Sequence, residues 1–298
     1  MSRNLIARIS VAAVAIPIIL WICYSGGWWL FGMLALFASV GIYEFLSAEG
    51  YRPRQPVFVL TILAVWVIYV SLAAPQAYIE QSFAHSDAAG ISGPFWVYGG
   101  QLVAGIAFLL VVLLGGMLFS IGKRSPAELF GAYTRLLWAV FYLGVLYGLV
   151  AVVDSDWFFG STVEGGDRLL FLFGLLWVGD TSAMWVGSAI GKHKLAPAVS
   201  PNKTVEGFLG GILGSLAIGA LMVFWKFSDI PWYHVLIIAL GCSVFGQLGD
   251  LTESMWKRSI GIKDSSAIIP GHGGVLDRFD SLLFAAPFML FYMLIFGL

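Results

Sequence analysis

The chain has 298 residues, of which 59% are hydrophobic and only 11% are charged, and its formal net charge is −1. A soluble domain carries about a quarter charged residues, so this composition excludes an ordinary soluble protein and predicts an integral membrane protein. The net charge by itself indicates no class of partner. We expect a lipid bilayer around the protein and no nucleic acid bound to it.

Apolar segments of roughly the ~20 residues that cross a bilayer recur along the whole chain. They predict an all-α integral membrane protein, a polytopic bundle of about nine transmembrane helices in one membrane-embedded domain, 1–298. Residues 1–153 would supply the N-terminal spans and residues 168–298 a catalytic C-terminal half. The predicted segments are 5–24, 27–48, 57–74, 95–119, 131–153, 168–190, 205–225, 231–250 and 281–297.

The positive charges predict how these spans are oriented. If the N-terminus is cytoplasmic, the Lys and Arg residues gather on the cytoplasmic side of the membrane. Only Arg168 and Lys226 fall on the external side. Cytoplasmic loops of membrane proteins carry this excess of positive charge. We therefore expect an external C-terminus, and the loops 191–204 and 251–280 on the same, cytoplasmic, side.

One ionisable residue, Asp180, lies inside the sixth predicted span. It is ~16 Å of helix from Gly191, at 1.5 Å per residue. A charge at that depth is costly and usually faces a polar cavity or a charged partner. We expect Asp180 to line a substrate cavity, and the alternative is a structural ion pair with another span.

The following loop reads GKHKLAPAVSPNKTVEG and combines lysines with hydroxyl and amide side chains. Backbone N–H groups at the start of the next helix, near Thr204, would add an anion site. The alternative for the lysines is that they only fix the membrane orientation. The residues of this loop that we expect to bind substrate are Lys194, Ser200, Asn202 and Lys203.

A second polar loop, 254–280, lies between the last two spans. Asp277 and Asp280 are three residues apart, on one helical face, where two carboxylates can share a divalent cation. Asp250 ends the preceding span, and helix ends that meet at one membrane face would complete a set of Mg²⁺ ligands. The alternative is that these carboxylates only cap helix ends.

Basic side chains surround the three carboxylates, and this combination indicates a polyphosphate substrate. Lys263 and Asp264 are expected to contact that substrate. His272 would hydrogen-bond a phosphate or transfer a proton, or else simply lie in a turn. The complete set of candidate catalytic residues is Asp250, Asp277, Asp280, Lys257, Arg258, His272 and Arg278.

The segment 254–280 resembles the signature of the phosphatidate cytidylyltransferase family, also called CDP-diacylglycerol synthases. Trp256 departs from the family pattern, which usually has an aliphatic residue or Phe there. The upstream stretches GDTSAMWVG and KLAPAVSPNKTVEG are also similar to family elements, so the likeness covers the C-terminal half closely. The matching residues are Ser254, Lys257, Arg258, Lys263, Asp264, Pro270, His272, Gly273, Gly274, Asp277, Arg278, Phe279 and Asp280.

The resemblance implies that CTP and phosphatidic acid react to give CDP-diacylglycerol and pyrophosphate. It implies Mg²⁺ held by Asp250, Asp277 and Asp280, with potassium as a further cation. It also implies a homodimer in the bacterial inner membrane, with the active site facing the cytoplasm.

Two other readings stay open at this point. Another membrane nucleotidyl- or phosphoryltransferase could use the same parts; a CDP-alcohol phosphotransferase, however, needs D-x-x-D-G-x-x-A-R, and Ser281 follows Asp280 here. A transporter of a phosphorylated solute would place charges in several spans and often show inverted repeats. Here Asp180 is the charge that lies deep inside a predicted span, and no repeat is visible.

Overall fold

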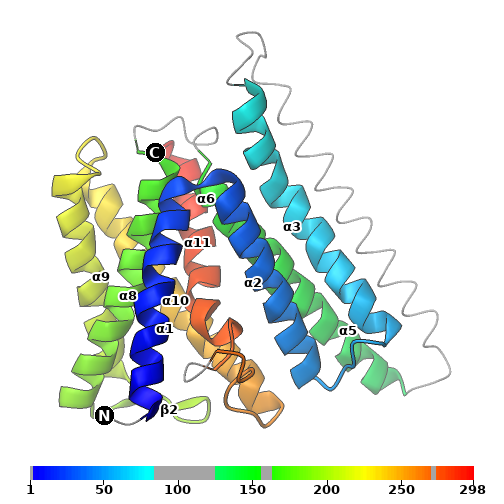
Figure 1. Ribbon diagram of the computed structural model, residues 1–298. Helices are drawn as coiled ribbons and strands as arrows, with labels where there is room; N and C mark the ends of the chain where they lie inside the picture. Colours follow the sequence, from blue (N-terminus) through cyan, green and yellow to red (C-terminus); the bar gives the residue numbers. More distant parts are fainter. Residues whose placement is uncertain (1–2, 84–124, 156–162, 270–272) are drawn as a thin grey trace. The chain divides into compact units, whose positions relative to one another are not determined.

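The computed structural model describes residues 3–83, 125–155, 163–269 and 273–298 (Figure 1). Within these ranges, seven helices are long and apolar enough to cross a membrane. This confirms the all-α polytopic class. The predicted span 95–119 lies outside the described residues, so the total of about nine helices and the orientation of the termini stay predictions.

The described chain divides into two compact units, and the first to consider is formed by residues 27–152. Its helices α2 and α3 pack on each other, and the Tyr69 hydroxyl donates to the Phe31 carbonyl at 2.7 Å. Helix α5 begins with a capping box, because the Ser125 side chain accepts from Glu128 N while the Glu128 side chain accepts from Ser125 N. The elements of this unit are α2 (Gly27–Ala48), α3 (Pro56–Phe83), α5 (Pro126–Val140), the short π-helix η1 (Phe141–Val145) and α6 (Leu146–Val153).

The other unit combines residues 1–26 with residues 153–298. In it, α8 packs along α9, α10 packs against both α9 and α11, and α1 lies on α8. A small antiparallel hairpin, with Lys194 opposite Thr204 and Ala196 opposite Ser200, joins α8 to α9. The elements are α1 (Arg3–Ser25), α8 (Gly165–Ile190), β1 (Lys194–Ala196), β2 (Ser200–Thr204), α9 (Val205–Trp225), α10 (Trp232–Ser259) and α11 (Leu276–Phe296).

Small residues let the helices of this unit approach closely, as in many membrane bundles. A Cβ atom on Gly207 of α9 would lie 2.8 Å from the carbonyl oxygen of Ala183 on α8. A Cβ atom on Gly249 of α10 would lie 2.6 Å from the carbonyl oxygen of Asp280 on α11. The second approach matters for function, because it places the neighbouring residue Asp250 beside α11.

At the ends of α8 and α9 away from the hairpin, charges are used structurally. Arg168 is fully buried, and its guanidinium donates to the carbonyl oxygens of Val153 and Val163 at 2.9 and 2.6 Å. Lys226 pairs with Asp167 at 3.1 Å, and this hydrogen bond raises the pKa of the lysine. These are the two basic residues that the sequence assigns to the external side.

Two expected boundaries are corrected. Helix α10 does not end near residue 250 but continues to Ser259, so Lys257 and Arg258 lie in its last turn rather than in a loop. Helix α11 begins at Leu276, which leaves only 260–275 as the connection between the two helices. The loop 191–204 is also more ordered than expected, because it contains β1 and β2.

Candidate functional site

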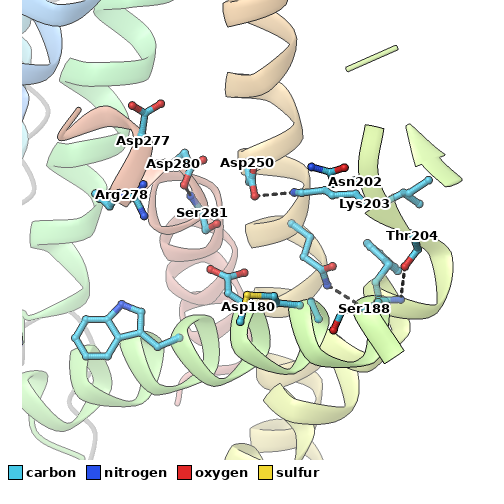
Figure 2. A pocket seen from close by; sticks show the side chains of 18 of the residues that line it. Asp180, Ser188, Asn202, Lys203, Thr204, Asp250, Asp277, Arg278, Asp280 and Ser281 are labelled. Carbon is cyan, nitrogen blue, oxygen red and sulfur yellow. Dashed lines mark hydrogen bonds and ion pairs between the residues drawn. The ribbon is translucent and has the colours of Figure 1, made fainter. Parts of the chain in front are cut away.

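A cavity of about 690 Å³ lies between α8, α9, α10, α11 and the hairpin (Figure 2). Carboxylates and cations that are far apart in the sequence face one another across it. The predicted site residues that line the cavity are Asp180, Asn202, Lys203, Asp250, Lys257, Asp264, Asp277, Arg278 and Asp280.

The hairpin brings Lys203 to this cavity. Thr204 ends β2 and caps α9, since its hydroxyl accepts from Gly207 N at 3.1 Å. The strand before this cap directs the neighbouring Lys203 towards α10, where its Nζ lies 2.6 Å from Asp250 Oδ2 (Figure 2). The Lys203 and Asp250 side chains remain 27% and 33% exposed, so both stay accessible from the cavity.

Three carboxylates converge on the same space from different helices. Asp180 comes from the middle of α8, Asp250 from α10 and Asp280 from the first turns of α11. They are close enough that Asp250 and Asp280 repel the charge of Asp180, while Lys203 attracts it. The sequence expectation that Asp180 faces a polar cavity is therefore matched by the geometry.

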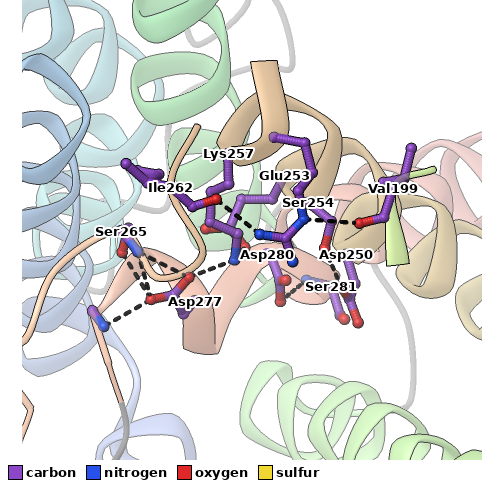
Figure 3. A network of polar contacts seen from close by, with 12 residues as sticks. Val199, Asp250, Glu253, Ser254, Lys257, Ile262, Ser265, Asp277, Asp280 and Ser281 are labelled. Atoms are coloured by element: carbon purple, nitrogen blue, oxygen red, sulfur yellow. Dashed lines mark hydrogen bonds and ion pairs between the residues drawn. The ribbon is translucent and has the colours of Figure 1, made fainter. Parts of the chain in front are cut away.

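The fourth carboxylate, Asp277, is held by donors from the 260–275 connection (Figure 3). Its Oδ2 accepts from Ser265 N and Ser265 Oγ, both at 3.0 Å, and from Gly274 N at 2.8 Å. Its Oδ1 lies 2.5 Å from Lys257 Nζ. Asp277 thus ties the connection to the start of α11, and its surroundings differ from those of Asp280 although the two residues share a helix.

Lys257 is the buried cation of the site. Its side chain is 10% exposed and contacts both Asp277 and Glu253, the latter at 3.2 Å from one turn earlier on α10. Glu253 itself is fully buried and does not line the cavity.

The remaining predicted residues lie elsewhere. Arg258 donates to the backbone carbonyls of Val199 at 3.2 Å and Ile262 at 2.8 Å, which joins the end of α10 to the hairpin turn. Lys194, Ser200 and Lys263 are not among the residues that line the cavity. His272 lies outside the described residues.

Several cavity residues were not expected from the sequence. Trp177, Met184 and Ser188 follow the helical spacing of Asp180 along one face of α8, and Gln247 precedes Asp250 by one turn of α10. Helical periodicity counted outward from the two aspartates would have found them. The apolar Leu195 and Phe208 carry no such signal.

The donor set suits a hard divalent cation, because carboxylate oxygens are the ligands that Mg²⁺ prefers. The mutual repulsion of Asp180, Asp250 and Asp280 is also a feature that a bound cation would relieve. As they stand, the described residues contain no preformed group of three or more metal-ligating side chains. Both oxygens of Asp277 and both oxygens of Asp250 already accept from protein donors, so a cation at either carboxylate would compete with a lysine, Lys257 or Lys203.

Comparison with known proteins gives a consistent result. The model of the cytidylyltransferase family matches residues 6–296. A protein of Staphylococcus haemolyticus named phosphatidate cytidylyltransferase is 33% identical over 282 residues, which cover 95% of this chain and 96% of that protein. A protein of the same name from Staphylococcus aureus is 38% identical over 198 residues, 66% of this chain and 71% of the relative.

Proposed function

Because the chain belongs to the cytidylyltransferase family, we propose that it transfers CMP from CTP to phosphatidic acid, forming CDP-diacylglycerol and pyrophosphate. The observation that carries this proposal is the cavity in which Lys203, Lys257 and Arg278 face Asp180, Asp250 and Asp280. Positive and negative groups that line one cavity suit a polyphosphate, whose charge has to be neutralised while a metal-binding position is kept.

The reaction places modest demands on acid–base chemistry. The nucleophile is a phosphate oxygen of phosphatidic acid, which is already anionic, so no strong general base is required. It attacks the α-phosphorus of CTP, the bond to the β-phosphate oxygen breaks, and pyrophosphate leaves with that electron pair. The protein has to align the two phosphates and stabilise the charge on the leaving group.

The lysines and the arginine would perform most of that stabilisation. Lys203 touches Asp250 at the cavity wall, and its partly exposed ammonium group can reach phosphate oxygens. Lys257 also lines the cavity, but its ammonium group is held between Glu253 and Asp277 and would act mainly through its positive charge. Asp250 and Asp280 would hold Mg²⁺, with Asp277 as the further ligand expected from the sequence. When bound, a divalent cation withdraws charge from the phosphate oxygens.

The cavity also suits the meeting of a lipid with a nucleotide. Its wall includes Trp177, Met184 and Phe208 from membrane-spanning helices, while Asn202 and Lys203 come from the hairpin outside the spans. We infer that the hairpin side faces the cytoplasm of a bacterial inner membrane, in accordance with the positive charges of its loop. The homodimer and the potassium ion expected from the sequence stay predictions.

Pyrophosphate release by the purified protein tests the proposal. We expect release from CTP with Mg²⁺ only when phosphatidic acid is present, and none when diacylglycerol, which lacks the phosphate nucleophile, replaces it. Release that is indifferent to the lipid would show CTP hydrolysis instead. Transport of a phosphorylated solute without any release would favour the transporter reading.

A further inference from the structure

We propose that Glu253 is a positioning residue for this reaction, which acts through Lys257 to hold Asp277, and with it Ser265 and Gly274, in place. The inference rests on the proposed function and deepens it, because it adds a residue that never reaches the cavity. Glu253 lies outside the cavity wall, whereas Lys257 and Asp277 are part of it.

The contact between Glu253 and Lys257 is fully enclosed. The Glu253 side chain has 0% exposure, and its Oε2 accepts from Lys257 Nζ at 3.2 Å. The same Nζ lies 2.5 Å from Asp277 Oδ1 (Figure 3). One buried ammonium group therefore bridges a carboxylate of α10 and a carboxylate of α11.

The chain of contacts continues from Asp277 into the connection between the helices. Asp277 accepts from the backbone and the hydroxyl of Ser265 and from the backbone of Gly274. Ser265 lies twelve positions before Asp277 and Gly274 lies three positions before it, so Asp277 contacts two separate parts of the connection. The position of the connection thus depends on Asp277, and that of Asp277 depends on Lys257.

Electrostatics explains why Lys257 needs Glu253. A buried ammonium group loses its hydration and stays in place only when anionic partners compensate that loss. Asp277 shares its charge with three donors of the connection, so it compensates Lys257 only in part. Glu253 has no such competing donor: its Oε1 has no hydrogen-bond partner among the described residues.

The same Oε1 argues against a purely structural role. The Glu253 carboxyl faces that of Asp280, which repels it (Figure 3). A Gln side chain has the same shape and its amide would donate to Asp280, so packing alone would favour Gln at this position. The Glu253 carboxyl differs from such an amide in its ion-pair contact with Lys257, and to this contact we assign the positioning of the ammonium group.

Charge and shape can be separated with two variants of the full-length protein in lipid nanodiscs. Glu253→Gln keeps the shape and removes the charge, whereas Glu253→Asp keeps the charge and shortens the side chain. We expect amide hydrogen exchange at Ser265 and Gly274 to rise ~10-fold or more in Glu253→Gln and to change less than ~3-fold in Glu253→Asp. The opposite order, or no change in either variant, would overturn the proposal.

A double-mutant cycle tests whether Glu253 acts through Lys257. We expect Glu253→Gln combined with Lys257→Met to lose no more turnover than Lys257→Met alone, within ~2-fold, because both changes remove the same interaction. Losses that multiply would show that Glu253 acts by another route. Should Glu253→Gln not purify in monodisperse form, Lys257→Met takes its place: exchange at the two amides should rise in it and not in Glu253→Asp.

Asp167→Asn is the matched control, since it breaks a carboxylate–lysine pair at the other end of α8. It should leave both the exchange at Ser265 and Gly274 and the turnover unchanged. The exchange experiment needs no substrate, so the two proposals can fail separately. An inactive wild-type protein whose amides still respond to Glu253→Gln would refute the proposed reaction alone.

Discussion

Lys203 differs from a lysine that only fixes the orientation of a protein in the membrane. Cytoplasmic lysines are common in membrane proteins for topological reasons alone. Lys192 in the same loop fits that description, because it is exposed and does not line the cavity. Lys203 instead lies 2.6 Å from Asp250 and forms part of the cavity wall.

Changing each of these lysines to Gln therefore separates the two roles. We expect Lys203→Gln to lower kcat/KM for CTP by ~10-fold to ~100-fold, because one charge-assisted contact to phosphate is lost. Lys192→Gln makes the same change of charge in the same loop and should stay within ~2-fold of the wild type. Equal effects of both variants on turnover would assign Lys203 to topology alone.

The proposed Mg²⁺ site can be tested at Asp250, which lines the cavity. Asp250→Asn keeps the size of the side chain and removes a ligand charge. We expect kcat to fall at least ~100-fold, about 2.7 kcal/mol, as when one preorganised charge-stabilising group is removed. The loss should shrink as the Mg²⁺ concentration is raised in a steady-state assay.

Asp250 lies within α10 and not at its end, so the alternative role is the ion pair with Lys203 alone. The variant would then lose at most ~1 kcal/mol of stability and keep normal turnover. Asp229→Asn provides the control, because Asp229 is exposed between α9 and α10, away from the cavity.

Among the helices, α10 extends beyond the apolar segment that hydropathy identifies. Apolar residues become sparse near 250, where the sequence predicts that the span ends, but the helix continues to Ser259. The helix continues because Glu253 and Lys257 pair one turn apart and Lys257 and Arg258 suit its negative C-terminal end. It stops before Gly261, whose φ of +76° favours glycine.

Close approach between α10 and α11 depends on Gly249, which gives a prediction for these two elements. Gly249→Ala would bring a methyl group within 2.6 Å of the Asp280 carbonyl oxygen and 3.1 Å of Phe284 Cβ. We expect a loss of about 1–3 kcal/mol in stability from this overpacking, together with reduced turnover as Asp250 and Asp280 shift. Thermal unfolding in detergent, followed by near-UV circular dichroism, measures the first effect.

Gly174→Ala is the control on α8, where the new methyl group would meet Ile218 Cγ2 at an ordinary 3.5 Å. Because Ala forms helix better than Gly, this variant should be as stable as the wild type or slightly more so. A Gly249→Ala protein that is equally stable and active would contradict the close approach described for α10 and α11.

Across the whole chain, the charged motifs indicated the polar residues of the cavity but not its apolar wall. All residues that line the cavity lie between 177 and 281, within the C-terminal half that the charged motifs indicated. The apolar wall residues Leu195 and Phe208 were missed, because an apolar side chain in a membrane protein carries no local signal. The sequence does not predict the contact between Glu253 and Lys257, because it depends on burial that only folding creates.

Orientation in the membrane is a property of the whole chain, and thiol labelling in intact cells tests it. We expect Lys194→Cys and Lys263→Cys to resist an impermeant thiol reagent added outside, because both positions are exposed in loops assigned to the cytoplasm. Both should react after the cells are permeabilised. The native Cys23 and Cys242 are buried and serve as the background.

Transfer of CMP to a lipid phosphate can be measured by following the α- and γ-phosphates of CTP. The purified protein would receive phosphatidic acid, Mg²⁺ and CTP labelled in either the α- or the γ-phosphate, and the lipid would then be extracted. We expect α-label to enter the lipid while γ-label is released as pyrophosphate, and Asp250→Asn to lose both events together. Transfer of γ-label to the lipid, or release of pyrophosphate without α-label in the lipid, would contradict this transfer of CMP.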